Sequence, residues 1–336
     1  MPKLPRLSVR LHGGMTPRQC AEQAAAAEAA GIDAVWFAEN PFARGIVPAA
    51  AACALATRTQ SIGAGVFNPY GRHPTLIAME IGALDELSGG RVRLGIGTGI
   101  AGAVERMGFG TGRSLTALRE AIVIVRALLR GETVTLAGTA FNVSNVKLDY
   151  RARADIPIFM AARGANAVKA CGELADGMIV SNMCAAGFVA EAVQSLNASA
   201  AAAARPPPGV VQYMPCVPRP DREAARSAAK RAIGDMLPAY WSLAQRLPDA
   251  RRALLTGSGI AETEIASTVT RLKAGEAAEA ALDDRFVDAF AIAGDADDCR
   301  AQAARFAEAG VTELALTFSG PTVPGDMAYI GKAFAG

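Results

Sequence analysis

Histidine is scarce in this sequence, which contains only two, and His12 stands where a site could form. It follows the apolar segment LSVRL (7–11), while Glu39 ends a second apolar segment, DAVWFAE (33–39). An imidazole titrates near neutral pH and a carboxylate can take up or release a proton, so both residue types serve acid–base chemistry. We predict His12 and Glu39 as the catalytic residues, with an ordinary loop histidine as the alternative for His12.

A positive charge and a helix start follow another apolar segment, IPIFMAA (156–162). Arg163 and Gly164 end this segment, and a helix is expected to begin near Asn166. Free backbone N–H groups at a helix start, together with the helix dipole, attract anions. We therefore predict that Arg163, Gly164 and Asn166 bind a phosphate, with Ser181 at the end of the next strand beside them. A capped surface helix is the alternative.

The stretch GTGIAG (97–102) matches the glycine spacing of dinucleotide-binding loops. In such a unit a helix starts at once, and an acidic residue some 20 residues later ends the next strand. Here the expected helix begins about ten residues too late, near Arg113, and Glu120 falls inside it. The pattern therefore argues against a dinucleotide-binding fold.

Short apolar runs alternate along the chain with longer amphipathic stretches, which predicts parallel strands connected by helices. About eight such units favour a single (βα)8 TIM-barrel domain over residues 1–336. Two insertions interrupt the rhythm: a small β-hairpin at 132–147 and a helical region at 220–283. The predicted strands are 7–11, 33–39, 61–67, 91–97, 156–162, 177–181, 210–217, 286–293 and 312–318.

Barrel enzymes carry their chemistry at the carboxyl ends of the strands, where this chain concentrates glycine and polar residues. Beyond the residues above, that position places four more residues at the predicted site: Asn40, Asn68, Gly97 and Thr98. The second histidine, His73, precedes Pro74 and is interpreted as the cap of a helix. The apolar face of that helix is predicted to consist of Leu76, Met79, Ala83, Leu84 and Leu87.

Composition excludes several classes of function. The 336 residues carry a net charge of +2 with scattered basic residues, which gives no reason to expect nucleic acid. No apolar run is long enough for a membrane span or has the features of a signal peptide. With six dispersed cysteines and only two histidines, a metal site is improbable. The cysteines are interpreted as reduced thiols in a cytoplasmic protein.

One segment carries a family resemblance. IGAGVFNPYGRHPTLIAMEIGALDELSGGRVRLGIGTG (62–99) closely resembles the bacterial luciferase-like superfamily, and within it the coenzyme F420-dependent methylenetetrahydromethanopterin reductases. GIDAVWFAE, PIFMAARGANAVKACGELADGMIVS and AIAGDADDCRAQAARFAEAGVTELAL fit the same family. The resemblance therefore extends over nearly the whole chain.

Membership implies a barrel that binds F420 or, alternatively, FMN at the carboxyl ends of its strands, and commonly a homodimer. In relatives a non-proline cis peptide in the third strand forms a bulge behind the cofactor ring; by position it would be Gly65–Val66 here. The implied ring and phosphate contacts are Asn68, Gly164, Asn166 and Ser181. Many deazaflavin-dependent relatives carry Asp-His where this chain has Glu39-Asn40, and some carry an acidic residue where Ile100 stands.

The main hypothesis is hydride transfer between bound F420 and a small organic substrate, with the redox chemistry supplied by the cofactor. An FMN-dependent monooxygenase that uses oxygen is the alternative. From other classes, the departures at Glu39-Asn40 and Ile100 leave a non-catalytic flavin-binding protein open. A cofactor-free lyase or isomerase is disfavoured because no lysine ends a predicted strand.

Overall fold

The computed structural model describes residues 3–320 and 322–335. Eight parallel strands form a closed ring in which each strand is hydrogen-bonded to the next, and the pairing of β8 with β9 closes it. This confirms the predicted (βα)8 barrel. In ring order the strands are β1 (Arg6–His12), β2 (Ala34–Ala38), β3 (Ser61–Phe67), β4 (Val92–Ile96), β7 (Ile158–Ala161), β8 (Gly177–Val180), β9 (Gly209–Pro218) and β11 (Glu313–Thr317).

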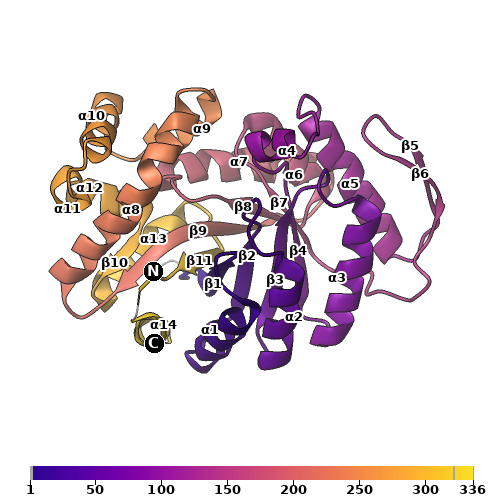
Figure 1. Cartoon of the computed structure of the whole chain (residues 1–336), viewed down its shortest axis with the longest axis horizontal. Helices are drawn as coiled ribbons and strands as arrows, with labels where there is room; N and C mark the ends of the chain where they lie inside the picture. The colour runs from indigo at the N-terminus through magenta and orange to yellow at the C-terminus, as the bar shows by residue number, and fades with distance from the viewer. Residues whose placement is uncertain (1–2, 321, 336) are drawn as a thin grey trace.

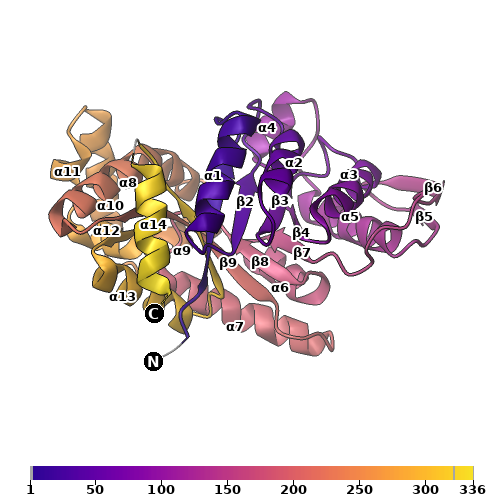
Figure 2. The same cartoon turned by 90° about the horizontal axis from the view of Figure 1, so that it is seen from below.

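Helices surround this ring (Figures 1 and 2). Helix α1 begins after Thr16, whose side chain accepts the Gln19 N–H, and Pro17 occupies the first helical position. His73 likewise caps α3, accepting the Thr75 N–H on its Nδ1. The helices of the barrel are α1 (Pro17–Ala29), α2 (Ile46–Ala56), α3 (Pro74–Ser88), α4 (Ala101–Arg106), α5 (Ser114–Leu129), α6 (Ala165–Leu174), α7 (Ala186–Ala202), α13 (Ala296–Glu308) and α14 (Val323–Phe334).

Two insertions extend from opposite sides of the barrel in Figure 1. The predicted hairpin is present as β5 (Val134–Ala137) and β6 (Asn142–Val146), and the Glu120 carboxylate of α5 accepts three backbone N–H groups from its turn. The helical insertion packs around its own apolar cluster, centred on side chains such as Phe286 and Phe290. Its helices are α8 (Arg222–Ala244), α9 (Pro248–Leu255), α10 (Glu262–Lys273), α11 (Ala278–Ala281) and α12 (Asp284–Phe290).

The predicted strand at 286–293 is wrong. Most of this segment is α12, which Asp283 caps, and only Ile292–Gly294 forms a strand, β10, paired with β9 outside the ring. Phe286, Val287 and Phe290 are buried at helical spacing. In a short run that is apolar throughout, this spacing is hard to tell from a buried strand. Helix α4 is a further difference, since it begins at Ala101, inside the GTGIAG stretch, where no helix was expected.

The predicted apolar face of α3 is also wrong in part. Leu84 is buried as expected, but Leu76, Met79 and Leu87 are each about half exposed. The buried face consists instead of side chains including Ile77 and Ile81. Because α3 is apolar on more than one face, periodicity alone could not identify the side that packs on the barrel.

The barrel interior has its own polar and aromatic filling. Arg93 forms a two-pronged ion pair with Glu313, whose carboxylate also accepts the Trp36 indole N–H at 2.6 Å. Phe159 packs edge-on against Trp36. This layer forms the floor beneath the carboxyl ends of the strands.

All six cysteines are buried free thiols. Burial raises their pKa values, that of Cys20 to about 11 and those of Cys171 and Cys299 to about 12. Within the described residues, no helix combines the length and hydropathy needed to cross a bilayer.

Candidate active site

His12 lies at the carboxyl end of β1, half-buried, and its Nδ1 accepts the Gly14 N–H at 3.2 Å. Burial and the nearby charge of Arg10 lower the pKa of His12. The neutral imidazole is therefore favoured at neutral pH, with its proton on Nε2 because Nδ1 is the acceptor. Such a ring can donate a hydrogen bond or take up a proton at the site.

Glu39 and Asn40 connect the ends of β1, β2 and β3. The Asn40 side chain accepts the Gly13 N–H at 3.2 Å, which ties the first two loops together. Burial raises the pKa of Glu39, although Arg72, 4.0 Å away, and the Asn68 N–H favour its charged form. Glu39 is half-buried, and it shares Arg72 with Glu80.

The third strand has the bulge that the resemblance implied. The Gly65–Val66 peptide is cis, and the pairing of β3 with β4 shifts register between Ala64 and Phe67. Glycine is required at position 65, where φ is +151° and a Cβ would lie 2.2 Å from the Gly95 carbonyl oxygen. Val66 packs against the apolar filling of the barrel interior.

Gly97, Thr98 and Asn68 lie beside this bulge. A Cβ on Gly97 would lie 2.7 Å from the Val66 side chain, so glycine leaves the room that Val66 occupies. Asn68 accepts the Gly71 N–H at 2.7 Å and so shapes the loop after β3. Thr98 follows β4 and is half-buried.

Arg163 and Ser181 join the ends of β7 and β8 through a guanidinium–hydroxyl hydrogen bond. Helix α6 begins at Ala165 with Gly164 as its N-cap, and no side chain caps its first turn. Asn166 is exposed in that turn. The Asp249 carboxylate lies against Gly164, 2.6 Å from the place of a Cβ. An incoming phosphate would therefore find favourable N–H groups and Arg163, together with one carboxylate that repels it.

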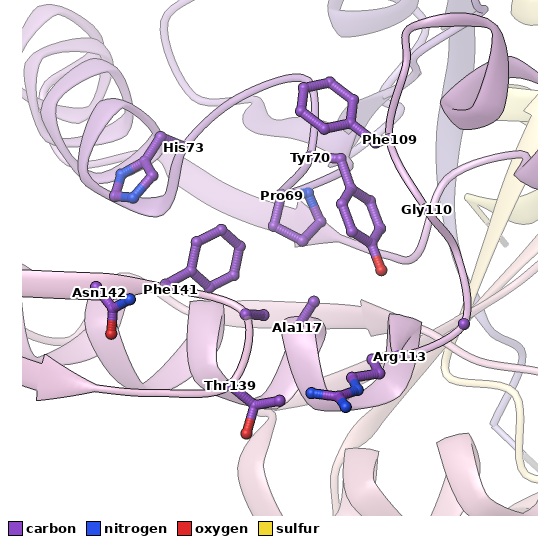
Figure 3. A pocket seen from close by; sticks show the side chains of 12 residues that line it. Pro69, Tyr70, His73, Phe109, Gly110, Arg113, Ala117, Thr139, Phe141 and Asn142 are labelled. Atoms are coloured by element: carbon purple, nitrogen blue, oxygen red, sulfur yellow. The ribbon is translucent and has the colours of Figure 1, made fainter.

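A pocket of about 590 Å³ is lined by residues of the loop after β3, such as Pro69 and Tyr70, and by the turn of the β5–β6 hairpin (Figure 3). Four aromatic rings contribute to its walls: the ring centres of Tyr70 and Phe109 are 6.1 Å apart, and Phe141 packs edge-on against His73. Arg113 lies at its edge in Figure 3. None of the predicted site residues lines this pocket, although it shares a loop with Asn68.

The structure gathers the predicted residues at one end of the barrel and adds others that sequence reasoning missed. Arg10 points into the interior, with its guanidinium 5.0 Å from the centre of the Tyr213 ring. Tyr240, from α8, approaches Arg163. The alternation of Ser8, Arg10 and His12 with apolar residues along β1 could have revealed Arg10. No local pattern marks Tyr240, because an insertion brings it to the site.

Fold and site together define a barrel of the luciferase type. Residues 4–313 match the luciferase-like monooxygenase family, and the chain belongs to that family. It is 31% identical over 322 residues to the 5,10-methylenetetrahydromethanopterin reductase of Methanolobus tindarius, covering 94% of this chain and 95% of the relative.

Two further proteins are similar. The F420-dependent glucose-6-phosphate dehydrogenase of Beutenbergia cavernae is 33% identical over 175 residues, which are 48% of this chain and 52% of that protein. The structure of the coenzyme F420-dependent tetrahydromethanopterin reductase of Methanopyrus kandleri superposes with a TM-score of 0.86 over 98% of both chains, at 24% identity. The resemblance found in the sequence is confirmed.

Proposed function

We propose that this protein is an oxidoreductase that transfers a hydride between bound coenzyme F420 and a small organic substrate. The observation that carries the proposal is the set of polar groups at the carboxyl ends of the strands. These groups can bind and orient a ligand and can exchange protons with it. None of them carries out redox chemistry, which a cofactor would supply. The similarity to an F420-dependent relative supports F420 over FMN.

The described residues fit such a cofactor. The uncapped start of α6 and Arg163 offer donors to a phosphate, and the Nε of Arg163 is buried without a hydrogen-bond partner. The Val66 side chain, with Gly97 beside it, provides an apolar surface for a ring. Asn68 and Ser181 stand next to these two parts. We assign cofactor binding to these residues and, through loop geometry, to Gly65, Gly164, Asn166, Asn40 and Thr98.

A bound deazaflavin supplies a carbon that accepts or donates the hydride. Residues of the chain donate or accept the proton that accompanies the hydride. His12, neutral and carrying its proton on Nε2, serves as donor or hydrogen-bond partner to a substrate oxygen. Glu39 is the second candidate, since its raised pKa lets it hold a proton nearer neutral pH.

Titration of the purified protein with F420 and with FMN tests the proposal. Ring fluorescence and absorbance are expected to report saturable F420 binding, followed by reduction of the ring with one member of an alcohol, aldehyde and sugar phosphate panel. Binding of FMN alone would identify the monooxygenase alternative. Binding without turnover would indicate a non-catalytic flavin-binding protein, and no binding of either cofactor would refute the redox proposal.

We also propose that the protein forms a homodimer through α2 and α3, which lie side by side (Figure 2). The exposed apolar side chains Leu76, Met79 and Leu87, which recur along one face of α3, support this, because apolar residues on one surface mark interaction sites. Sedimentation of the wild type and of the L76E/M79E variant tests it: a monomeric wild type would contradict the proposal.

We further propose that residues 1–336 form a single domain. From the six buried thiols we also propose a cytoplasmic location.

A further inference from the structure

Arg10 occupies an unusual position for a charged residue. Along β1, Leu7, Val9 and Leu11 belong to the apolar core between strands and helices, whereas Arg10 lies over Tyr213 inside the barrel. One of its terminal nitrogens makes a long hydrogen bond, 3.4 Å, to the Thr317 hydroxyl. Its Nε is buried without a partner. Among the described residues, no carboxylate oxygen comes within 4.0 Å of this guanidinium.

Three other partly buried arginines of this chain are each paired with a carboxylate. Arg93, in the layer below, binds both oxygens of Glu313. Arg126 pairs with Asp176 at 2.9 Å, and Arg153 pairs with Asp85. A charge removed from water is costly unless an opposite charge or a full set of acceptors compensates it. Arg10 has neither, which indicates that its counter-ion is not part of the chain.

None of the groups that contact Arg10 is acidic, and the carboxylate of Glu313, whose charge also acts on Tyr213, is already paired with Arg93. Arg10 contacts the Tyr213 ring and the Thr317 hydroxyl, and His12 stands two residues further along the same strand. The Arg163 guanidinium is 5.9 Å from the centre of the Tyr240 ring; burial raises the pKa of this phenol, while the charges of Arg163 and Arg10 act to lower it. This side of the barrel mouth is therefore positive and rich in hydrogen-bond donors.

A cofactor phosphate would satisfy only one of the two arginines. Arg163 stands at the β7–β8 corner beside the start of α6, where a phosphate fits. Arg10 stands on β1, and two strands, β11 and β9, separate β1 from β8 in the ring. The two guanidinium groups therefore lie at different parts of the barrel mouth, and Arg10 lies on the same strand as His12.

We propose that the substrate carries an oxyanion group, a carboxylate or a phosphate, which binds to Arg10 and is thereby held next to His12. This inference rests on the proposed redox function. A planar guanidinium binds an oxyanion through two parallel hydrogen bonds, which fixes orientation as well as affinity. Arg10 would thus determine specificity for anionic substrates.

Isothermal titration of the F420-bound protein with benzoate, phenyl phosphate and the neutral isostere benzamide tests the proposal. At least one of the two anions is expected to bind, with an affinity that Arg10→Gln lowers about tenfold or more. Arg10→Lys keeps the charge and is expected to retain part of the affinity. Benzamide should bind equally to all variants. Arg130→Gln, which removes an exposed charge at the end of α5, is the control and should leave anion affinity unchanged.

Fluorescence titration with F420 and with its tail-less precursor F0 accompanies each variant. Arg10→Gln is expected to bind both as the wild type does, which also verifies that the variant is folded. Weaker binding of F420 would assign Arg10 to the cofactor and overturn the proposal. Equal anion affinity in Arg10→Gln and wild type, or no anion binding to the wild type, would overturn it too. Absent F420 binding would instead refute the redox function, and the anion titrations can still be read on the protein alone.

Discussion

The buried ion pair in the barrel floor gives the sharpest quantitative prediction. Glu313 is only 4% exposed, and its carboxylate accepts two hydrogen bonds from Arg93, at 2.6 and 3.1 Å, and one from Trp36 at 2.6 Å. Glu313→Gln preserves the shape of this side chain but removes its charge. Arg93 would then remain inside the barrel without a counter-ion.

Breaking a buried pair in this way costs about 3–5 kcal/mol, because one charge stays desolvated and unpaired. The stacking of Arg93 on Trp36, 4.7 Å from the ring centre, fixes the guanidinium and limits its escape to water. Urea unfolding at pH 7 measures the loss. The matched control is Glu173→Gln, which removes the charge from the more exposed pair of Glu173 with Arg119 and should cost less than about 1 kcal/mol.

The pH dependence has a definite sign. Burial acts to raise the pKa of Glu313, but the charge of Arg93 and the hydrogen bonds from Arg93, Ser8 and Trp36 outweigh it, so the pKa is lowered on folding. The stabilisation is therefore fully present above the unfolded-state pKa, about 4.3, and is lost as the pH falls through the folded-state value. The wild type should lose its advantage over Glu313→Gln in that acid range.

Two results would refute this reasoning. The first is a cost for Glu313→Gln no larger than that for Glu173→Gln. The second is a constant difference in unfolding free energy between wild type and Glu313→Gln from pH 7 down to pH 3. Either would mean that water or a local rearrangement solvates Arg93 inside the barrel.

Three further predictions concern the cofactor site, the helix packing and the hairpin. Asp249→Asn removes the carboxylate beside Gly164 and should tighten F420 binding about two- to fivefold in a fluorescence titration; unchanged or weaker binding would place the phosphate elsewhere. Gly331→Ala puts a Cβ 2.0 Å from the Ala30 carbonyl oxygen and should cost about 1–3 kcal/mol in urea unfolding, whereas an alanine in open space at Gly102 should not. Glu120→Ala removes the acceptor of three backbone N–H groups and should speed amide hydrogen exchange at residues 139–141; unchanged rates would show that the turn holds itself.

Local patterns predicted most of the barrel because residues within each strand–helix unit mark where its strand and helix begin and end. Thr16 and Pro17 start α1, and the apolar segments that follow each helix form the strands of the ring. The failures have a common cause in tertiary context. The segment 286–293 is apolar at both helical and strand spacing, and only its packing on α8 selects the helix.

The site was predictable to the extent that strand ends meet at one edge of a barrel. His12, Glu39, Asn68 and Ser181 could be placed there from their positions alone. The Gly65–Val66 cis peptide came from family resemblance, since no local pattern in GVF specifies it. The approach of Asp249 to Gly164 depends on how the helical insertion folds back, which periodicity does not encode.

Because all six thiols are buried, the folded chain should not react with reagents that need an accessible thiolate. The cysteines sit on different elements, with Cys20 in α1, Cys53 in α2, Cys171 in α6, Cys184 in the loop after β8, Cys216 in β9 and Cys299 in α13. Each can be alkylated only when its own segment opens. The order in which the six sites acquire label would therefore record which segments of the barrel open first, without any engineered probe.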